Sequence, residues 1–486
     1  MKKLYFITGS QDLYGEETLR QVAEDSKDMV SFLDEKLGVA SVEWVPTVRD
    51  HKGAIDAMVK ASSDDECIGV IMWMHTFSPA KMWTTALQKL NKPMLHLHTQ
   101  HNEKLPYDEI DMDFMDLNQS AHGDREFGFM CTRLGIKREI VVGYYKNDST
   151  LNKIRRFAEA CIAVDFSHGM RVAMFGNNMI DVAVTDGDRV ESEIHFGWNV
   201  NYYAIGKLID IKNALTDAEI DAKMAEYNEK YIMDTDNIDA VREQASIEVA
   251  IDKFLEKNNI QAFTDTFQDL YGLKQLPGIA AQNVMARGIG FGPEGDYKTS
   301  ALCAVLNKFA EKRDGATGFT EDYTYDLTEG EELELASHML EVTPVFAASK
   351  PKIQVHPLGI GNREDPARLV FDSIEGDALQ ISIIDMGDRF RIICAKVELV
   401  KEPKNMPKLP VARLMWKLKP DFNTGAAAWI YAGGAHHAVV TTALDVDDIR
   451  LFCKLTDTEL VVIDENTDLV SFEKELELLD IKAKLK

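Results

Sequence analysis

The chain has 486 residues, 45% of them hydrophobic, and a formal net charge of −26. At roughly 150 residues per domain, this length predicts two to four domains with full-sized cores. The acidic balance argues against a nucleic-acid binder, which needs a basic face, and against attachment to anionic membranes.

Cysteine usage and the N-terminus bear on the compartment. None of the six cysteines forms a C-x-x-C pair, so we expect isolated, mostly buried thiols in a reducing environment. The apolar run near the N-terminus is too short for a signal peptide, and no segment is long enough to span a membrane. These features predict a cytoplasmic protein.

The first third of the chain alternates strand-like and helix-like segments. Apolar residues at helical spacing over 19–37 end at Gly38, a typical helix stop. Ser78 followed by Pro79 predicts another helix start. Strand-like runs cover residues 4–8, 39–45, 67–74 and 93–97. This alternation predicts a doubly wound, largely parallel sheet in a domain spanning 1–169.

Two further domains follow. A strand-like run at 170–175 starts a second doubly wound α/β domain, 170–315, in which Thr216 and Glu219 form a capping box for a helix. Beyond it, strand-like runs predominate, at 353–356, 367–371, 379–384 and 390–400. We therefore predict a third, β-rich and barrel-like domain over 316–486.

Most of the chemistry-bearing groups lie between residues 288 and 341. Glu294 and Glu321 occur in glycine-rich or aromatic surroundings, His338 follows, and AGGAHHAVV adds a histidine pair further on. Loops of this composition position functional groups more often than they pack a core. Two carboxylates and two imidazoles can form a divalent-metal site with room for a substrate.

A nucleotide-binding interpretation of this stretch is weaker. Gly290, Gly292 and Gly295 spell G-x-G-x-x-G, the pattern of a dinucleotide site. However, Pro293 removes one of the N–H groups that a pyrophosphate needs, and Glu294 adds a negative charge beside it. The preceding AQNVMAR is also helix-like rather than strand-like. We therefore prefer the metal interpretation.

Other polar and aromatic residues allow more than one role. We interpret His98 and His101 as polar residues of a loop or interface rather than metal ligands. His122 lies in HGDREFG, where a substrate or subunit contact is an alternative to holding its own loop. The loop SQDLYG follows the first strand-like run, where α/β proteins often bind ligands. Phe267, from composition alone, is more typical of core packing than of a ligand wall.

Several long motifs occur in one order along nearly the whole chain. They are GSQDLYG, WMHTFSPAKMW, HTQHN, DMDFMDLNQSAHGDREFG, AVTDGD, TFQDLYGLKQLPG, GPEGDYKT, TEDYTY, SHMLEVTP, HPLGIGNREDPARL, LPKLPVA and AGGAHH. Together they closely resemble the bacterial L-arabinose isomerases, within the L-fucose/L-arabinose isomerase superfamily. The resemblance implies two α/β domains, then a β-rich domain, and a homo-oligomer, either a hexamer or a tetramer.

The resemblance also implies an activity. Members convert L-arabinose into L-ribulose, the first step of L-arabinose catabolism, through a metal-stabilised enediol(ate). The positions that match the family's Mn²⁺ ligands are Glu294, Glu321, His338 and His437. Co²⁺ or Fe²⁺ could substitute in such a site. Glu294 and Glu321 also match the acid–base pair, and which of them is the base stays open.

Sugar contacts follow from the resemblance as well. The residues that match the family's sugar pocket are Gln11, Leu13, Tyr14, Met179, Phe267 and Met339. His122 matches the position at which a neighbouring subunit reaches into that pocket. Asn177, Ile180 and Pro293 differ from the acidic, basic and alanine residues found in many members; these differences concern substrate preference and loop rigidity.

The implied chemistry explains the residue types. The C2 proton of an aldose is barely acidic, so a divalent ion that polarises the carbonyl makes its removal easier. One carboxylate removes that proton, and the other, protonated, serves the oxygens. Three alternatives stay open: an isomerase for L-fucose or D-galactose, a non-catalytic sugar-binding protein, and a metal-dependent hydrolase.

Overall fold

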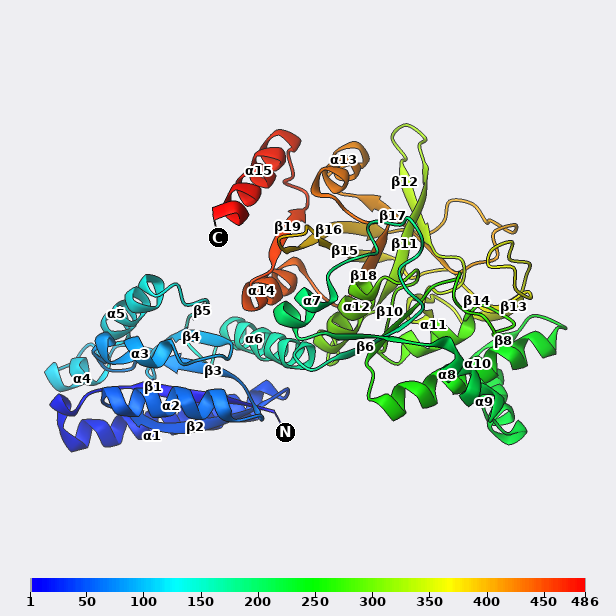
Figure 1. Ribbon diagram of the computed structural model, residues 1–486. Helices are drawn as coiled ribbons and strands as arrows, with labels where there is room; N and C mark the ends of the chain where they lie inside the picture. Colours follow the sequence, from blue (N-terminus) through cyan, green and yellow to red (C-terminus); the bar gives the residue numbers. More distant parts are fainter. Residues whose placement is uncertain (1, 486) are drawn as a thin grey trace. The chain divides into compact units, whose positions relative to one another are not determined.

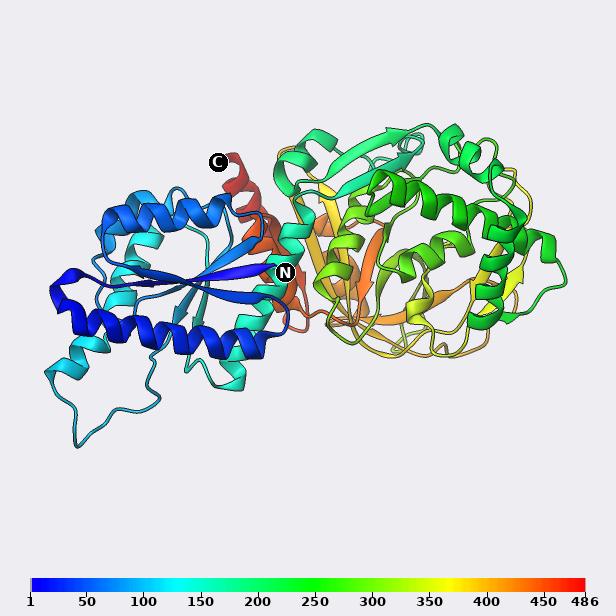
Figure 2. The ribbon, with the colours of Figure 1, turned by 90° about the horizontal axis from the view of Figure 1, so that it is seen from below.

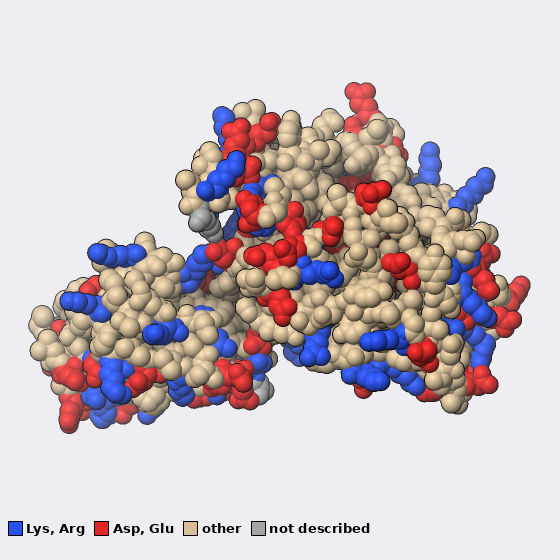
Figure 3. All heavy atoms as spheres, in the orientation of Figure 1, with Lys and Arg blue, Asp and Glu red and all other residues tan. Residues whose placement is uncertain are grey.

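The computed structural model describes residues 2–485 and divides into two compact units, Met1–Asp165 and Phe166–Lys486. Each unit has its own sheets and its own core (Figure 1). On the face drawn in Figure 3, acidic and basic side chains are interspersed over both units.

The N-terminal unit is built around one parallel sheet with strand order β2-β1-β3-β4-β5. Its strands are β1 (Lys3–Gly9), β2 (Ser41–Val48), β3 (Cys67–Trp73), β4 (Met94–His98) and β5 (Glu139–Val142). Its helices are η1 (Asp12–Tyr14), α1 (Gly15–Leu37), α2 (His51–Ser63), η2 (Ala80–Trp83), α3 (Thr84–Leu87), α4 (Met112–Leu117), α5 (Ser120–Arg133) and α6 (Asp148–Ser167).

Helices cover both faces of this sheet, as Figure 2 shows. Neighbouring residues of a strand point to opposite faces. Ile7 packs with residues of α2 and α5, whereas the next residue, Thr8, accepts a hydrogen bond from Ser26 of α1 on the other side. Because both faces are covered, β3 is buried along its whole length.

The second unit begins with another parallel sheet, of order β10-β9-β6-β7. Its strands are β6 (Arg171–Phe175), β7 (Asn199–Tyr203), β9 (Ala262–Asp265) and β10 (Gly290–Phe291). The helices of this region are α7 (Arg189–Phe196), α8 (Ile205–Asn213), α9 (Asp217–Lys230), α10 (Ile238–Asn258), α11 (Ile279–Ala286) and α12 (Tyr297–Phe309). Phe175 and Phe263 of the sheet pack against Phe254 of α10 in one continuous core.

A closed six-stranded barrel follows, of order β15-β18-β11-β12-β17-β16, with β16 pairing back to β15 and with β19 alongside β16. Its six strands are β11 (Thr317–Asp326), β12 (Leu333–Ser337), β15 (Gly376–Asp385), β16 (Phe390–Leu399), β17 (Arg413–Leu418) and β18 (His437–Thr441), and the added strand is β19 (Glu459–Ile463). The remaining elements are η3 (Pro344–Phe346), α13 (Phe422–Ala432), α14 (Val446–Thr456) and α15 (Leu469–Leu485). Two parallel α/β sheets and a β-barrel confirm the predicted fold class.

A small sheet joins distant parts of the second unit. Its order is β14-β13-β8, formed by β8 (Ile232–Met233), β13 (Lys352–Val355) and β14 (Ala367–Val370). Strand β8 belongs to the α/β part of the chain, and β13 and β14 come after the first barrel strands. Backbone hydrogen bonds therefore join the α/β part to the segment that lies between barrel strands β12 and β15.

Local signals had mixed outcomes. Thr216 and Glu219 form the predicted capping box, and Gly38 ends α1 with a left-handed φ of 70°. The helix start expected at Ser78 and Pro79 is wrong: a 3-10 turn begins at Ala80, because Pro79 has an extended ψ of 110°. The Ser78 hydroxyl accepts a hydrogen bond from the Trp83 indole rather than capping a helix.

The thiols and the membrane question complete the description. All six cysteines are buried and free, as predicted. Burial raises the pKa of each thiol, to about 12 for Cys131 and Cys394. Within residues 2–485, every helix is too short or too polar to cross a membrane.

Candidate active site

Three neighbouring barrel strands supply three of the four predicted metal ligands. On the order β18-β11-β12, Glu321 of β11 lies opposite His437 of β18 on one side and opposite Ser337 of β12 on the other. His338 follows Ser337 directly. Phe319, two residues before Glu321, places its ring edge-on to both imidazoles, at centroid distances of 5.5 and 5.2 Å. Strand register therefore brings these side chains to one end of the barrel.

The fourth predicted ligand, Glu294, comes from the loop between β10 and α12. It has a left-handed φ of 64°, and its carbonyl accepts a 3.0 Å hydrogen bond from the Met179 amide. A Cβ at the next residue, Gly295, would lie 2.6 Å from Cα of Asn178, so only glycine fits there. The Glu294 loop is thus clamped against the loop that follows β6.

The four predicted ligands converge. Glu294 Oε2 lies 3.8 Å from Nε2 of His437, and Glu321 Oε2 lies 3.8 Å from Nε2 of His338. The two imidazole rings are 6.2 Å apart, centroid to centroid. His436, which is not among the predicted ligands, also approaches Glu294: its Nε2 lies 3.9 Å from Glu294 Oε2. Glu294, His436 and His437 together form a group able to hold an ion.

Both buried histidines are held through their other ring nitrogen. His437 Nδ1 lies 3.0 Å from Asp296 Oδ2, and His338 Nδ1 is in contact with Glu341 Oε2. Within residues 2–485, Nε2 of each ring is buried without a hydrogen-bond partner. Carboxylates that fix Nδ1 and leave Nε2 free are typical of metal-binding histidines. The donor set therefore fits a divalent ion.

The electrostatics of the site point the same way. Burial lowers the pKa of His338, but the Glu341 carboxylate outweighs this effect and raises it to about 9. Burial raises the pKa of Glu294, but the imidazoles of His436, His437 and His338 outweigh this effect and hold it below its usual range. A site that draws positive charge onto a buried imidazole also favours a bound cation, which would displace that proton.

Asp265 adds a further buried carboxyl group near Glu341, His338 and Glu294. Asp265 ends β9, is 2% exposed, and its Oδ1 has no hydrogen-bond partner in the described chain. Burial and then the charge of Glu341 raise its pKa to about 8. Asp265 therefore tends to be protonated, which limits the negative charge collected beside Glu294.

The three predicted sugar contacts of this unit adjoin the site. Phe267 and Met179 line one cavity of about 380 Å³, together with Tyr271 and residues 360–363. The Phe267 ring stacks on His338 at a centroid distance of 5.9 Å. Met339 is half-buried next to His338. Phe267 also belongs to the hydrophobic core, so it serves as both core packing and cavity wall.

The other predicted contacts lie on the N-terminal unit, at the carboxyl ends of its strands. Gln11 directly precedes η1, which contains Leu13 and Tyr14, and the Leu13 side chain is 83% exposed. His122 lies exposed near the start of α5, stacked on Phe77. A hydrogen bond between Thr76 and Ser10 joins these two segments.

Two other histidines of this unit pair with aspartates. His98 Nδ1 lies 2.6 Å from Asp124, and His101 Nε2 lies 3.0 Å from Asp28. Asp124 also accepts from His96, at 2.9 Å. These contacts fit the structural role that we gave to His98 and His101.

Asp296 and Glu341, which hold the two histidines, were not predicted from the sequence. Asp296 is two residues after Glu294, and Glu341 is three residues after His338, so they lie inside the motifs GPEGDYKT and SHMLEVTP. An acidic residue three positions after a histidine was an available signal for Glu341. Asp296 could not be linked to His437 from sequence, because 141 positions separate them.

Comparisons with known proteins agree with this arrangement. Three protein-family models match the chain: the L-arabinose isomerase N-terminal domain over residues 1–169, the central domain over 171–312 and the C-terminal domain over 316–459. A solved periplasmic solute-binding protein from Actinobacillus succinogenes with bound D-allose covers 65% of this chain and 93% of its own. Its identity of 11% and TM-score of 0.16 are too low to bear on fold or function.

Curated relatives match almost end to end. An L-arabinose isomerase of Halalkalibacterium halodurans is 47% identical over 481 residues, covering 97% of this chain and 96% of the relative. Those of Shouchella clausii and Clostridium beijerinckii are 48% and 47% identical, each covering 98% of this chain and 97% of the relative. The chain therefore belongs to the L-arabinose isomerase family of aldose–ketose isomerases.

Proposed function

We propose that this protein converts L-arabinose into L-ribulose, with Glu294 and Glu321 as its acid–base pair and Mn²⁺ as its cofactor. The observation that carries the proposal is the convergence on these two carboxylates of two buried imidazole nitrogens that have no hydrogen-bond partner within residues 2–485. The names of the relatives supply the sugar.

The residues that would hold the ion are Glu294, Glu321, His338 and His437. This mixed oxygen and imidazole set suits Mn²⁺ and tolerates Co²⁺ or Fe²⁺. Bound there, the ion would polarise the sugar carbonyl and offset the negative charge that develops on the sugar oxygens. Asp296 and Glu341 orient the two rings so that Nε2 faces the carboxylates.

The chain's own groups move the protons. Isomerisation transfers the hydrogen on C2 to C1 and a proton from O2 to O1, so it needs no external oxidant or reductant. One of the two glutamates accepts the C2 proton and returns it to C1, while the other carries the proton between the oxygens. Phe267 and Met179 offer apolar side chains to a cavity beside His338, where the carbon chain of a sugar could pack.

Metal removal tests the proposal. Chelator-treated protein should lose ketose formation from L-arabinose and recover it with Mn²⁺. Parallel assays with D-galactose and L-fucose check the sugar. Full activity in protein shown to be metal-free by elemental analysis would contradict the metal assignment, and a clear preference for another aldose would contradict the substrate.

We also propose a cytoplasmic homo-oligomer, a hexamer or a tetramer. Apolar side chains that are exposed on the N-terminal unit support association, among them Tyr107 at 81%, Met112 at 66% and Phe129 at 56%. Six free thiols support a reducing compartment. Native mass spectrometry measures the subunit number, and a monomer that retains full activity would contradict the assembly.

A further inference from the structure

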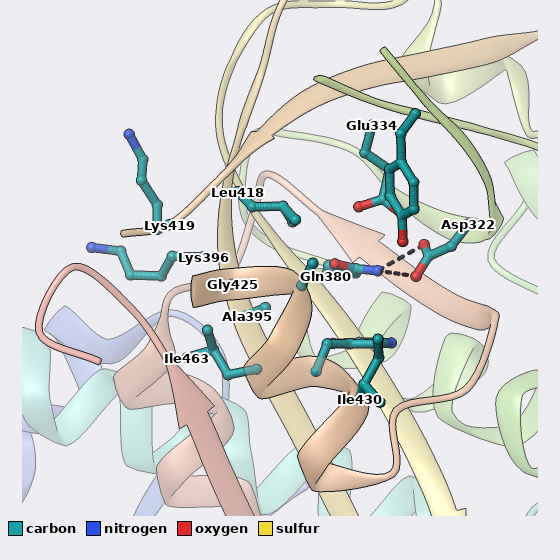
Figure 4. A pocket seen from close by; sticks show the side chains of 13 residues that line it. Asp322, Glu334, Gln380, Ala395, Lys396, Leu418, Lys419, Gly425, Ile430 and Ile463 are labelled. Atoms are coloured by element: carbon teal, nitrogen blue, oxygen red, sulfur yellow. Dashed lines mark hydrogen bonds between the residues drawn. The ribbon is translucent and has the colours of Figure 1, made fainter. Parts of the chain in front are cut away.

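A separate cavity lies between the barrel and helix α13 (Figure 4). Strands β11, β12, β15, β16 and β17 all contribute to its wall, and α13 and β19 complete it. Its volume of about 20 Å³ is enough for one water-sized particle. None of the residues that line it belongs to the active site described above.

Two carboxylates line this cavity. Both oxygens of Asp322 accept hydrogen bonds from the Gln380 amide nitrogen, at 2.7 Å each. Glu334 is 3% exposed, and its Oε2 accepts from the Trp416 indole at 3.0 Å. Its other oxygen, Oε1, is buried with no hydrogen-bond partner anywhere in residues 2–485. A buried acceptor of this kind calls for a ligand.

The nearby ammonium groups do not neutralise the pair. Lys396 and Lys419 also line the cavity, but their Nζ atoms pair with Glu465 at 2.6 Å and with Glu398 at 3.2 Å. Figure 4 shows the ends of both lysines pointing away from Asp322 and Glu334. Within the described residues, neither carboxylate takes part in an ion pair. A buried Glu334 carboxylate beside a partly buried Asp322 carboxylate, without a counter-charge, is destabilising.

A proton shared between Glu334 and Asp322 is the alternative to a bound ion, because a protonated carboxyl can donate to the other carboxylate. A cation in the cavity would coordinate the unpartnered Glu334 oxygen and would also neutralise the negative charge of the two carboxylates.

We propose that this cavity binds a hard divalent cation such as Ca²⁺. The oxygen donors that line it are the carboxylates of Asp322 and Glu334, the Gln380 amide and the Tyr325 phenol. Such an all-oxygen set favours Ca²⁺ over ions that prefer nitrogen or sulfur ligands. The mixed Glu and His site is chemically different, so the two sites select different ions.

The proposed Ca²⁺ site and the proposed Mn²⁺ site use adjacent residues of β11. Asp322 directly follows Glu321 on β11, and neighbouring residues of a strand point to opposite faces. The Asp322 amide also donates a 2.8 Å hydrogen bond to the His436 carbonyl. The bound cation therefore braces the strand and the loop that carry Glu321 and His437. It does not depend on the isomerase proposal, because no residue is shared.

Luminescence of Tb³⁺, which substitutes for Ca²⁺, tests the site. Tyr325 and Trp429 line the cavity, so excitation of these aromatic groups should sensitise Tb³⁺ emission that Ca²⁺ displaces. The double variant Asp322→Asn/Glu334→Gln should lose this emission and the heat of Ca²⁺ binding. The matched control is Glu331→Gln, which removes a charge from the exposed β11–β12 turn and should behave like wild type.

A second variant locates the ion. Trp429→Phe should keep the heat of Ca²⁺ binding and lose part of the sensitised emission, whether or not the double variant folds. The proposal is overturned if wild type shows neither displaceable emission nor Ca²⁺ heat, which would assign the cavity to water or a shared proton. It is equally overturned if a folded double variant, verified by circular dichroism, binds Ca²⁺ as wild type does.

Discussion

Glu321 lies directly opposite His437 across the β11–β18 pairing. Residues that face each other on antiparallel strands keep their Cβ atoms about 5 Å apart. The spacing of this carboxylate and this imidazole is therefore a property of the barrel and not of a mobile loop. A slip of one residue would turn one side chain to the other face, so strand register also sets the geometry of the proposed site.

The partner of His437 gives the first prediction. Asp296→Asn should lower Mn²⁺ affinity about 10- to 100-fold, because the amide no longer holds the ring as the carboxylate does. Asparagine caps a helix as well as aspartate, so the N-cap of α12, in which Asp296 accepts from Thr299 N, should survive. Mn²⁺ titration measures the affinity, and an unfolding curve within about 1 kcal/mol of wild type verifies the fold.

The adjacent histidines give the second prediction. His437 is fully buried on β18, whereas the His436 side chain is 37% exposed. His437→Gln should abolish tight Mn²⁺ binding, while His436→Gln should retain most of it, because the free Nε2 and the fixing carboxylate belong to His437. Comparable Mn²⁺ affinities in the His437 variant and wild type would show that His436 is the ligand.

The third prediction concerns a site shared between subunits. His122 is exposed on the N-terminal unit, and Glu294 belongs to the second unit. His122→Ala and Glu294→Gln should each be poorly active, since every site then lacks one group. Dissociated and reassembled together, some sites would combine an intact His122 from one chain with an intact Glu294 from another.

Such a mixture should exceed both parents in L-arabinose isomerisation. Mass spectrometry must first show that subunits have exchanged. If mixed oligomers form and activity stays at the parental level, His122 does not serve a neighbouring site and only holds its own loop through Gln119 and Phe77.

A buried lysine gives the fourth prediction. Lys298 is 0% exposed, donates to the carbonyls of Thr185 and Asp186 at 2.9 and 2.5 Å, and lies 3.7 Å from Asp296. Lys298→Met leaves these groups uncompensated and should lower the free energy of unfolding by about 3–5 kcal/mol.

The control for Lys298 lies on the same helix. Lys308 forms a partly exposed pair with Glu311, so Lys308→Met should change the free energy of unfolding by at most about 1 kcal/mol. Urea unfolding measures both variants. Equal stabilities would show that Lys298 contributes no more than a surface charge.

Signals that act over a few residues were readable from the sequence. The alternation of apolar runs predicted the parallel sheets, and the Thr216–Glu219 capping box needs only four residues of chain. Ser78 failed for the opposite reason, because its hydroxyl is engaged by Trp83 and not by its own backbone. Where a side chain has two possible partners, tertiary packing decides between them.

In the candidate site too, local motifs could be recognised from the sequence, whereas contacts between distant residues could not. Glu294, Glu321, His338 and His437 could be named because whole motifs resemble those of a family. The roles of Asp296 and Asp322 could not, since they depend on approaches of Asp296 to His437 and of Asp322 to Gln380 across the fold. In a chain with 80 acidic residues, one more carboxylate carries no signal until its surroundings are known.

The order of the barrel strands also has a consequence for biosynthesis. Strand β18, with His437 at its start, lies between β15 and β11, although both leave the ribosome long before it. Until β18 inserts, both of those strands present an unpaired edge, and Glu321 has no imidazole opposite it. The proposed Mn²⁺ site can therefore form only after His437 has been synthesised and β18 has inserted between the two earlier strands.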